Sequence, residues 1–369
     1  MNIVYSYLDF QQVSDFTISS FERERHISRR IKEEKKRIRE ILLSIHKKKG
    51  NSLLLTAEER RIFEQLQEYS DREGPKMFQT AADDRRLRFQ LGQKDRFLQG
   101  LYYSGRYLPL MEKIFRDRGL PIELTRLPFV ESSFNLKARS KVGASGIWQF
   151  MASTGKFFMH VGDTVDERND PIRATEGAAQ LLQQNYETLH QWPLALTAYN
   201  HGRLGMVRAV QQVGSENISK IIDDYKSASF GFASSNFYAE FLAALHISQN
   251  PQRYFGEIEM DHPIEYAEFV MTDYVDFTDI ATYTRIPMDT LQELNPGLSD
   301  YVIESTRLIP AGFVLRIPPQ QRDSFLVRYN EIPGHRKFAT QRGPTGDLLA
   351  IHKKGSTRFI RRAISSSRR

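Results

Sequence analysis

The chain has 369 residues, and its hydrophobic share of 40% is enough for a sizeable core spread over two or three domains. It contains no cysteine, which excludes disulfides, thiolate metal sites, a cysteine nucleophile and a lipidated cysteine within this sequence. The net charge of +7 is confined to residues 340–369, where eight Lys and Arg stand against one Asp. Because residues 1–339 are balanced in charge, we expect no binding to nucleic acid.

Residues 1–75 are predicted to form a charged helical region. Residues 20–42 are dense in charge and lack glycine and proline, while Ile27, Ile31, Ile38 and Leu42 form a thin apolar stripe. The first twenty residues lack a basic segment followed by an apolar one, so they do not resemble a secretory signal. No apolar run reaches the ~18–20 residues of a membrane-spanning helix.

Residues 76–255 predict a mainly α-helical domain, in which amphipathic patterns alternate with turns rich in Gly, Pro, Asn and Asp. Pro121 and Pro193 stand where a first-turn proline begins a helix. The pair Asp170 and Pro171 is a second start signal, since a capping carboxylate precedes a proline.

Residues 256–320 predict a small α+β module of βααβ order. We expect a strand near Phe269–Val275 and two short helices near Asp279–Tyr283 and Met288–Leu294, followed by a closing strand at Phe313–Ile317. The remaining residues 321–369 form a basic tail that is predicted to be poorly ordered.

Glu131 is the candidate catalytic residue. Within residues 119–135, Leu120, Leu124, Leu127 and Phe134 fall on one helical stripe, and Glu131 fills the gap in that stripe. A carboxyl on a buried face is costly to ionise, so its pKa should rise, as general-acid cleavage of a glycosidic bond requires.

The alternative for Glu131 is a structural role. A glutamate at a helix end can bend toward solvent, or it can pair with Arg126 or Arg139.

Residues 141–155 combine glycines with the run from Trp148 to Met151. This composition suits a sugar, because it offers apolar rings and the amide of Gln149 close to backbone that glycine leaves accessible. The alternative is a helix start with its own core residues.

Two later segments offer polar side chains to a substrate. Tyr199 and Asn200 close a short helix that ends at Gly202, and Tyr238 lies on another amphipathic helix. An ordinary helix end and core packing are the respective alternatives.

Four motifs, in this order along the chain, resemble the lytic murein transglycosylases: ESSF, GASGIWQFM, AYNHG and NFYAEFLAA. The stretches YLPLMEKIFRDRGLP and VDERNDPIRATEGAAQLL match as well, so the resemblance covers about residues 85–250. It implies a lysozyme-like helical catalytic domain that cleaves the MurNAc–GlcNAc β-1,4 bond of peptidoglycan without water. The expected products carry 1,6-anhydro-MurNAc ends.

The resemblance also implies roles for individual residues. Glu131 matches the single catalytic acid/base. The positions that match substrate-binding residues are Ser132, Ser140, Gln149, Phe150, Met151, Tyr199, Asn200 and Tyr238. The sequence departs from the pattern at Leu136 and Ala152, where proline is usual, and His201 occupies the variable place of the third motif.

One carboxylate is sufficient for this reaction. Lysozyme-type hydrolysis uses two carboxylates, whereas the substrate's own C6 hydroxyl can replace water and the base that activates it. The acids that follow Glu131, namely Asp163, Asp166, Glu167 and Asp170, lie in a polar loop suited to helix capping. No metal or cofactor is expected.

Two other functions stay open at this point. A hydrolytic muramidase would place a second carboxylate near Glu131, and a non-catalytic peptidoglycan-binding protein would not need Glu131 at all.

Residues 265–318 resemble a LysM module, in which Asn295, Pro296 and Gly297 match the L-N-P-x-L turn. The usual Gly-Asp-Thr opening is absent, so glycan binding and a pure packing role are both open. We expect peptidoglycan glycan strands as the partner, a monomer, and a location in the bacterial cell envelope, in the periplasm or at the outer membrane. The basic tail is expected to contact anionic envelope surfaces.

Overall fold

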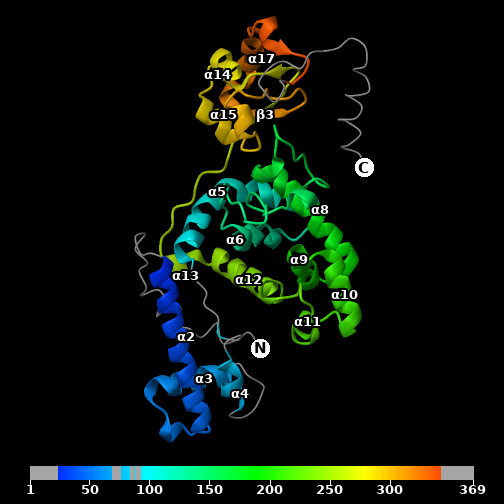
Figure 1. Ribbon diagram of the computed structural model, residues 1–369. Coiled ribbons are helices and arrows are strands. Elements are labelled where there is room, and N and C mark those ends of the chain that lie inside the picture. The colour runs from blue at the N-terminus through cyan, green and yellow to red at the C-terminus, as the bar shows by residue number, and fades with distance from the viewer. Residues whose placement is uncertain (1–23, 69–75, 84–86, 88–92, 342–369) are drawn as a thin grey trace. The chain divides into compact units, whose positions relative to one another are not determined.

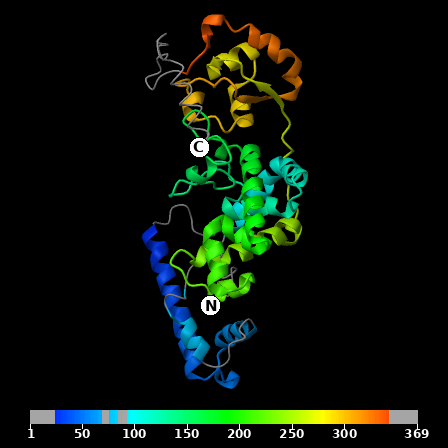
Figure 2. The ribbon, with the colours of Figure 1, turned by 90° about the vertical axis from the view of Figure 1, so that its right-hand side faces the viewer.

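The computed structural model describes the chain except for residues 1–23, 69–75, 84–86, 88–92 and 342–369 (Figure 1, and from the side in Figure 2). The chain divides into two units, one of residues 1–95 and 209–235 and one of residues 96–208 and 236–369. The predicted mainly helical fold is confirmed, since the described part consists of helices with four short strands. Among the described residues, no helix combines the length and the apolar content that crossing a membrane requires.

The first unit has its own core. Its N-terminal helices are α2 (Glu24–Lys47), α3 (Ala57–Glu68) and α4 (Lys76–Ala81). The second half of the predicted apolar stripe is part of this core, because Ile38 and Leu42 are buried together with Phe78, whereas Ile31 is only half-buried and the side chain of Ile27 lies outside the described part. Phe78 belongs to α4, so the predicted boundary at residue 75 is wrong and the N-terminal region continues beyond it.

Residues 96–208 and 236–255 of the second unit contain Glu131, and this part is called the catalytic region after that candidate residue. Its helices surround one core that includes Phe115, Leu127, Trp148 and Leu182, all fully buried. The helices are α5 (Lys94–Asp117), α6 (Leu127–Glu131), α7 (Ala152–Gly155), α8 (Pro171–Leu189), α9 (Trp192–His201), α10 (Arg203–Val213), α12 (Phe232–Gln249) and α13 (Pro251–Phe255). Helix α11 (Ile218–Asp224) belongs to the first unit.

The predicted helix signals at the loop between α7 and α8 are confirmed. Asp170 caps α8, because its side chain accepts hydrogen bonds from the backbone N–H groups of Ile172 and Arg173. Pro171 occupies the first helical position, where its missing N–H costs no hydrogen bond. Asp166 likewise caps the short 3-10 helix η4 (Glu167–Asn169).

The C-terminal module comprises residues 265–341 and departs from the predicted βααβ order, because the strand predicted near Phe269–Val275 is two separate strands and three helices, rather than two, precede the closing strand. Strand β1 (Ala267–Val270) pairs with β3 (Val314–Ile317) in antiparallel fashion, in the register Ala267↔Ile317. Between them lie β2 (Tyr274–Val275) and the helices α14 (Phe277–Thr284), α15 (Met288–Leu294) and α16 (Asp300–Ile303).

The prediction of a poorly ordered tail from residue 321 is wrong for its first part. Residues 322–338 form α17 (Arg322–Asn330) and β4 (Lys337–Phe338), and β4 pairs with β2. Phe325 and Tyr329 are buried in the core of the module, which explains why α17 folds onto it. The basic residues beyond 341 lie outside the described part of the chain.

Candidate active site

Glu131 is the last residue of α6, and the predicted continuous helical stripe is wrong beyond it. A 3-10 helix, η3 (Ile122–Arg126), precedes α6, and Ser133 and Phe134 have left-handed backbone angles, with φ of 52° and 55°. The turn brings the Phe134 ring edge-on to that of Phe129, with 4.7 Å between the centroids. Phe134 is therefore buried as expected, but by a reversal of the chain that leaves Glu131 at a helix end.

Close packing supports this reversal. The carbonyl of Ser133 lies against α5 at Gly100, where an added Cβ would be 2.6 Å from the Ser133 oxygen. Only glycine fits this position without displacing the turn after Glu131.

The surroundings of Glu131 keep its carboxyl protonated. Its pKa is raised from 4.5 to about 8, chiefly by burial and further by the negative charge of Glu240. Pairing with Arg126, one of the structural alternatives, is wrong, because Arg126 lies 2.5 Å from Glu112 instead. A carboxyl with this pKa can donate a proton at neutral pH.

Glu240 is a second carboxylate that the sequence analysis did not select. It belongs to α12 and keeps much of its surface exposed, but the protein around its carboxyl is sufficient to raise its own pKa. It lies in the fourth motif between Phe237 and Phe241, and these two buried side chains pack α12 against the core of the catalytic region. Its place in that motif was the available signal, since α12 is remote from Glu131 in sequence.

Three of the predicted substrate residues are engaged with the backbone around Glu131. Ser132 Oγ donates to the Ile147 carbonyl at 2.9 Å, and Ser140 Oγ accepts from the Ala144 N–H at 2.9 Å. The Gln149 side-chain amide donates to the carbonyls of Gly146 and Ala138 at 2.8 and 3.2 Å. These contacts give the three side chains a role in shaping the segment of residues 138–151.

Phe150 and Met151 are neighbours in the second motif, but the first side chain lies in the core and the second lies at the surface. Phe150 is 2% exposed and packs in the core, so only its backbone can reach a substrate, whereas Met151 is 39% exposed. Arg168 fixes this end of the segment, because its guanidinium donates to the carbonyls of Phe150 and Gly143 at 3.1 and 3.0 Å.

The third motif meets the second beside Glu131. The Tyr199 hydroxyl donates to the Trp148 carbonyl at 2.8 Å, and burial, with a smaller contribution from the charge of Glu131, raises the pKa of Tyr199. Asn200, the next residue, is exposed at the end of α9, and Gly202 ends the helix with a φ of 86°. Tyr238 packs against the same core from α12.

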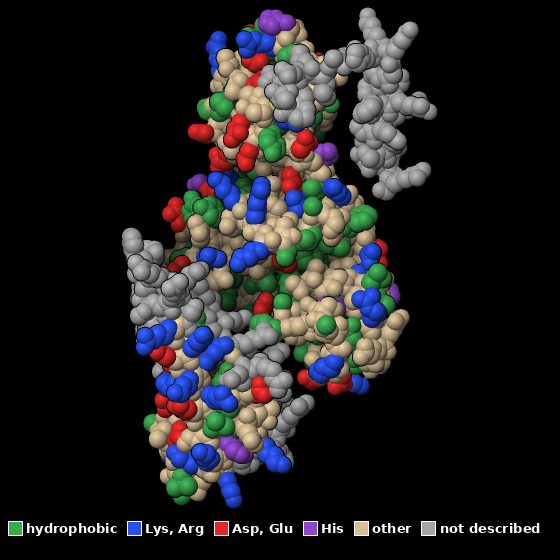
Figure 3. Space-filling view, in the orientation of Figure 1, with side chains coloured by type: hydrophobic (Ala, Val, Ile, Leu, Met, Phe, Trp, Pro, Cys, Tyr) green, Lys and Arg blue, Asp and Glu red, His purple; other side chains and the backbone are tan. Residues whose placement is uncertain are grey.

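The structure thus brings Glu131, Ser132, Tyr199 and Glu240 into one neighbourhood. Figure 3 shows a hollow on this face, at the place where α6 and α12 lie in Figure 1, with hydrophobic and acidic side chains at its edge. Across the described ranges, no cluster of His, Asp and Glu has the grouping of a metal site. The arrangement is that of a shielded acid in a depression.

Comparison with known proteins agrees with this geometry. Residues 112–222, which include Glu131 and Tyr199, match the transglycosylase SLT domain. Membrane-bound lytic murein transglycosylase D of Escherichia coli is 27% identical over 186 residues, covering 50% of this chain and 40% of that protein. A protein of an Alteromonas species, proposed to confer tributyltin chloride resistance, is 34% identical over 109 residues, covering 29% of this chain and 53% of its own length.

Among solved structures, an inactive variant of the lytic transglycosylase Slt from Pseudomonas aeruginosa matches with a TM-score of 0.31 at 15% identity. The match covers 63% of this chain and 40% of that one. The chain spans about two fifths of the length of the lytic transglycosylase D sequences that it matches.

Proposed function

Because residues 112–222 match the transglycosylase SLT domain and contain the shielded carboxyl, we propose that the protein is a peptidoglycan lytic transglycosylase. It cleaves the MurNAc–GlcNAc β-1,4 bond and leaves a 1,6-anhydro-MurNAc end. The observation that carries this proposal is the position of Glu131 at the end of α6, with a pKa raised to about 8.

Glu131 performs both proton transfers. Its protonated carboxyl donates to the glycosidic oxygen as the C1–O bond breaks, and the resulting carboxylate then accepts the proton of the C6 hydroxyl. The C6 oxygen closes on C1, so the proton that Glu131 lost is regained and no water is consumed. Attack within one sugar replaces the second carboxylate of a hydrolase.

The remaining predicted residues provide the binding surface. Met151 and Asn200 are exposed and can contact the sugar, while Tyr238 packs against the core. Ser132, Ser140, Gln149 and Phe150 act through the backbone that they hold, as their contacts indicate.

The antiparallel pairing of β1 with β3, with short helices between them, supports assigning residues 265–318 to a LysM-like module. We assign the whole protein to the bacterial cell envelope, where its substrate is found, and expect it to act as a monomer on glycan strands. The basic tail beyond residue 341 would add attraction to anionic envelope surfaces.

Mass spectrometry of muropeptides released from purified sacculi tests the activity. Wild type should release products one water lighter than hydrolysed ones, Glu131→Gln should release none, and Glu123→Gln should match wild type because Glu123 is exposed at the start of the same segment. Sacculi that are bound but not cut by wild type would instead indicate a non-catalytic binding protein.

A hydrolytic muramidase is the second candidate, and the proximity of Glu240 to Glu131 is the observation that favours it. Retaining and inverting hydrolases both place a second carboxylate at the reacting bond. Reducing-end products that disappear in Glu240→Gln would support this candidate over the anhydro-forming reaction.

A further inference from the structure

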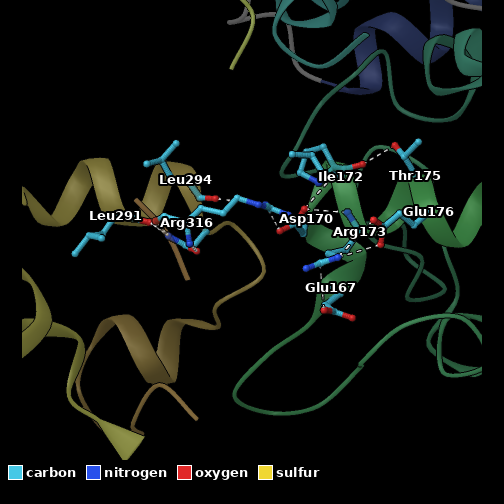
Figure 4. Close-up of polar contacts among 11 residues, drawn as sticks. Glu167, Asp170, Ile172, Arg173, Thr175, Glu176, Leu291, Leu294 and Arg316 are labelled. Carbon is cyan, nitrogen blue, oxygen red and sulfur yellow. Dashed lines mark hydrogen bonds and ion pairs between the residues drawn. The ribbon is translucent and has the colours of Figure 1, made fainter. Parts of the chain in front are cut away.

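Arg316 and Asp170 connect the C-terminal module to the catalytic region through a buried ion pair (Figure 4). The Nη1 atom of Arg316 lies 2.6 Å from Oδ2 of Asp170, and the two residues are 3% and 5% exposed. The side-chain amide of Asn295 fixes the backbone of Arg316, accepting from its N–H and donating to its carbonyl, both at 2.8 Å. Removing one partner of such a pair leaves a buried charge without compensation.

Backbone contacts hold the same two parts together. The N–H of Asp166 donates to the Gly297 carbonyl at 2.8 Å, and the N–H of Ser299 donates to the Thr164 carbonyl at 3.0 Å. Val165 of the catalytic region is 3% exposed and belongs to the hydrophobic core of the module. The module is therefore packed on the loop before α8 and shares a core with it.

Asp170 also holds the N-terminus of α8, so the ion pair with Arg316 is linked to that helix. Its second oxygen, Oδ1, caps the helix by accepting from the N–H groups of Ile172 and Arg173 at 3.0 and 3.1 Å. In the first turn of α8, Thr175 Oγ1 donates to the Pro171 carbonyl at 2.6 Å and accepts from Trp148 Nε1 at 2.8 Å. Thr175 and Trp148 are both fully buried, so the position of the indole depends on that turn.

Trp148 in turn lies next to the groups that surround Glu131. Its carbonyl accepts the hydrogen bond of Tyr199, and the preceding carbonyl of Ile147 accepts that of Ser132. Ser132 directly follows Glu131, while Tyr199 is close enough to experience its charge. A displacement of the α8 turn would therefore reach Glu131 through Trp148.

We propose that Arg316 is a positioning residue for Glu131, acting through Asp170, the first turn of α8 and Trp148. This role presupposes the proposed function, since it concerns the same carboxyl. It gives the C-terminal module a task besides any binding of glycan: the module holds the active-site segment in its productive arrangement.

The test compares Arg316→Met with Arg316→Lys in the full-length protein, well below the unfolding temperature of each variant. Arg316→Met should lower kcat for release of anhydro products between about tenfold and a hundredfold, because a small displacement of a catalytic group costs this much. KM should change by less than about twofold, since the sugar-binding surface is intact. Arg316→Lys, which restores a charge for Asp170, should recover much of kcat.

Arg307→Met is the matched control. Arg307 also bridges the two parts, with Nε 3.8 Å from Oδ2 of Asp163, but Asp163 is 71% exposed. The Arg307 side chain is 15% exposed, but the carboxylate that it pairs with is solvated, so loss of this pair should leave kcat within about twofold of wild type.

Trp148 supplies a readout that is independent of turnover. The chain has two tryptophans, so in a Trp192→Phe background the fluorescence reports on Trp148 alone. Arg316→Met should shift this emission to longer wavelength by admitting water near the indole, and Arg307→Met should not.

The outcomes separate the two proposals. If Arg316→Met lowers the unfolding temperature but keeps the wild-type kcat and Trp148 emission, Arg316 is structural only and the positioning role is overturned. An equal loss of kcat in Arg307→Met also overturns it, because the buried pair would not be the cause. Wild type that releases no anhydro product refutes the proposed function and, with it, this role.

Discussion

Substitution of Glu240 with Gln removes a charge near Glu131 and keeps the size and most of the packing of the side chain. Glu131 donates its proton only in the protonated form, so activity falls as the pH rises through its pKa. Removing the negative charge of Glu240 makes the Glu131 carboxylate easier to form and lowers its pKa. We therefore expect the alkaline limb of the kcat/KM profile to move to lower pH.

The structure bounds the size of this displacement. The pKa of Glu131 is raised from 4.5 to about 8, and burial is the larger of the two causes. Glu240 thus accounts for less than half of the rise, which corresponds to under about 2 pH units. The alkaline limb should lie near pH 8 in wild type, as the pKa of Glu131 requires, and below it in the variant.

The assay is the pH dependence of kcat/KM for release of muropeptides by wild type, Glu240→Gln and the control Glu123→Gln. Glu123 is exposed at the start of the segment that ends in Glu131, so its variant should keep the wild-type profile. An alkaline limb that does not move in Glu240→Gln would refute the electrostatic coupling. Loss of activity at every pH would show that Glu240 takes part in the chemistry itself.

Two stability predictions follow from the same region. The Glu131 carboxyl has a pKa of about 8 in the folded protein and about 4.5 in the unfolded chain, so wild type should lose stability as the pH rises between these values. Glu131→Gln lacks this carboxyl and should therefore be more stable than wild type at pH 8. The gain in the free energy of unfolding in urea should be about 2–4 kcal/mol, and identical curves would contradict the burial of the carboxyl. Gly146→Ala should cost at least about 2 kcal/mol, because the new Cβ would lie 1.8 Å from the Arg168 carbonyl oxygen at a φ of +77°. Gly143 also has a positive φ, +91°, but a Cβ added there would meet no atom within 4 Å. Gly143→Ala should therefore lower the unfolding temperature less than Gly146→Ala does, and an equal fall would show that the clash with Arg168 is absent.

Local signals in the sequence determined much of the architecture. The capping carboxylate of Asp170 before Pro171, and the glycine at 202, mark helix ends because their effects operate within one turn. The residue pattern of the module likewise predicted α14, α15 and β3 within about two residues of their observed bounds, but it merged β1 and β2 into one strand and missed α16. Motif order selected Glu131 as the candidate acid, and burial raises its pKa as that role requires.

Other features depended on contacts that no local pattern contains. The reversal after Glu131 arises because Phe134 packs on Phe129 and the turn fits against Gly100 of α5, which periodicity alone could not anticipate. The module continues to residue 338 because Phe325 and Tyr329 complete its core, although the sequence analysis had assigned these residues to the tail.

The sequence by itself determined the helical class and selected Glu131 as the candidate acid, because these depend on residue type and short spacing. Only the tertiary structure decided what surrounds the acid. Glu240 acts on Glu131 from another helix, and Arg316 pairs with Asp170 across 146 residues of sequence. Charge and burial act through space, so their partners are defined only once the chain has folded.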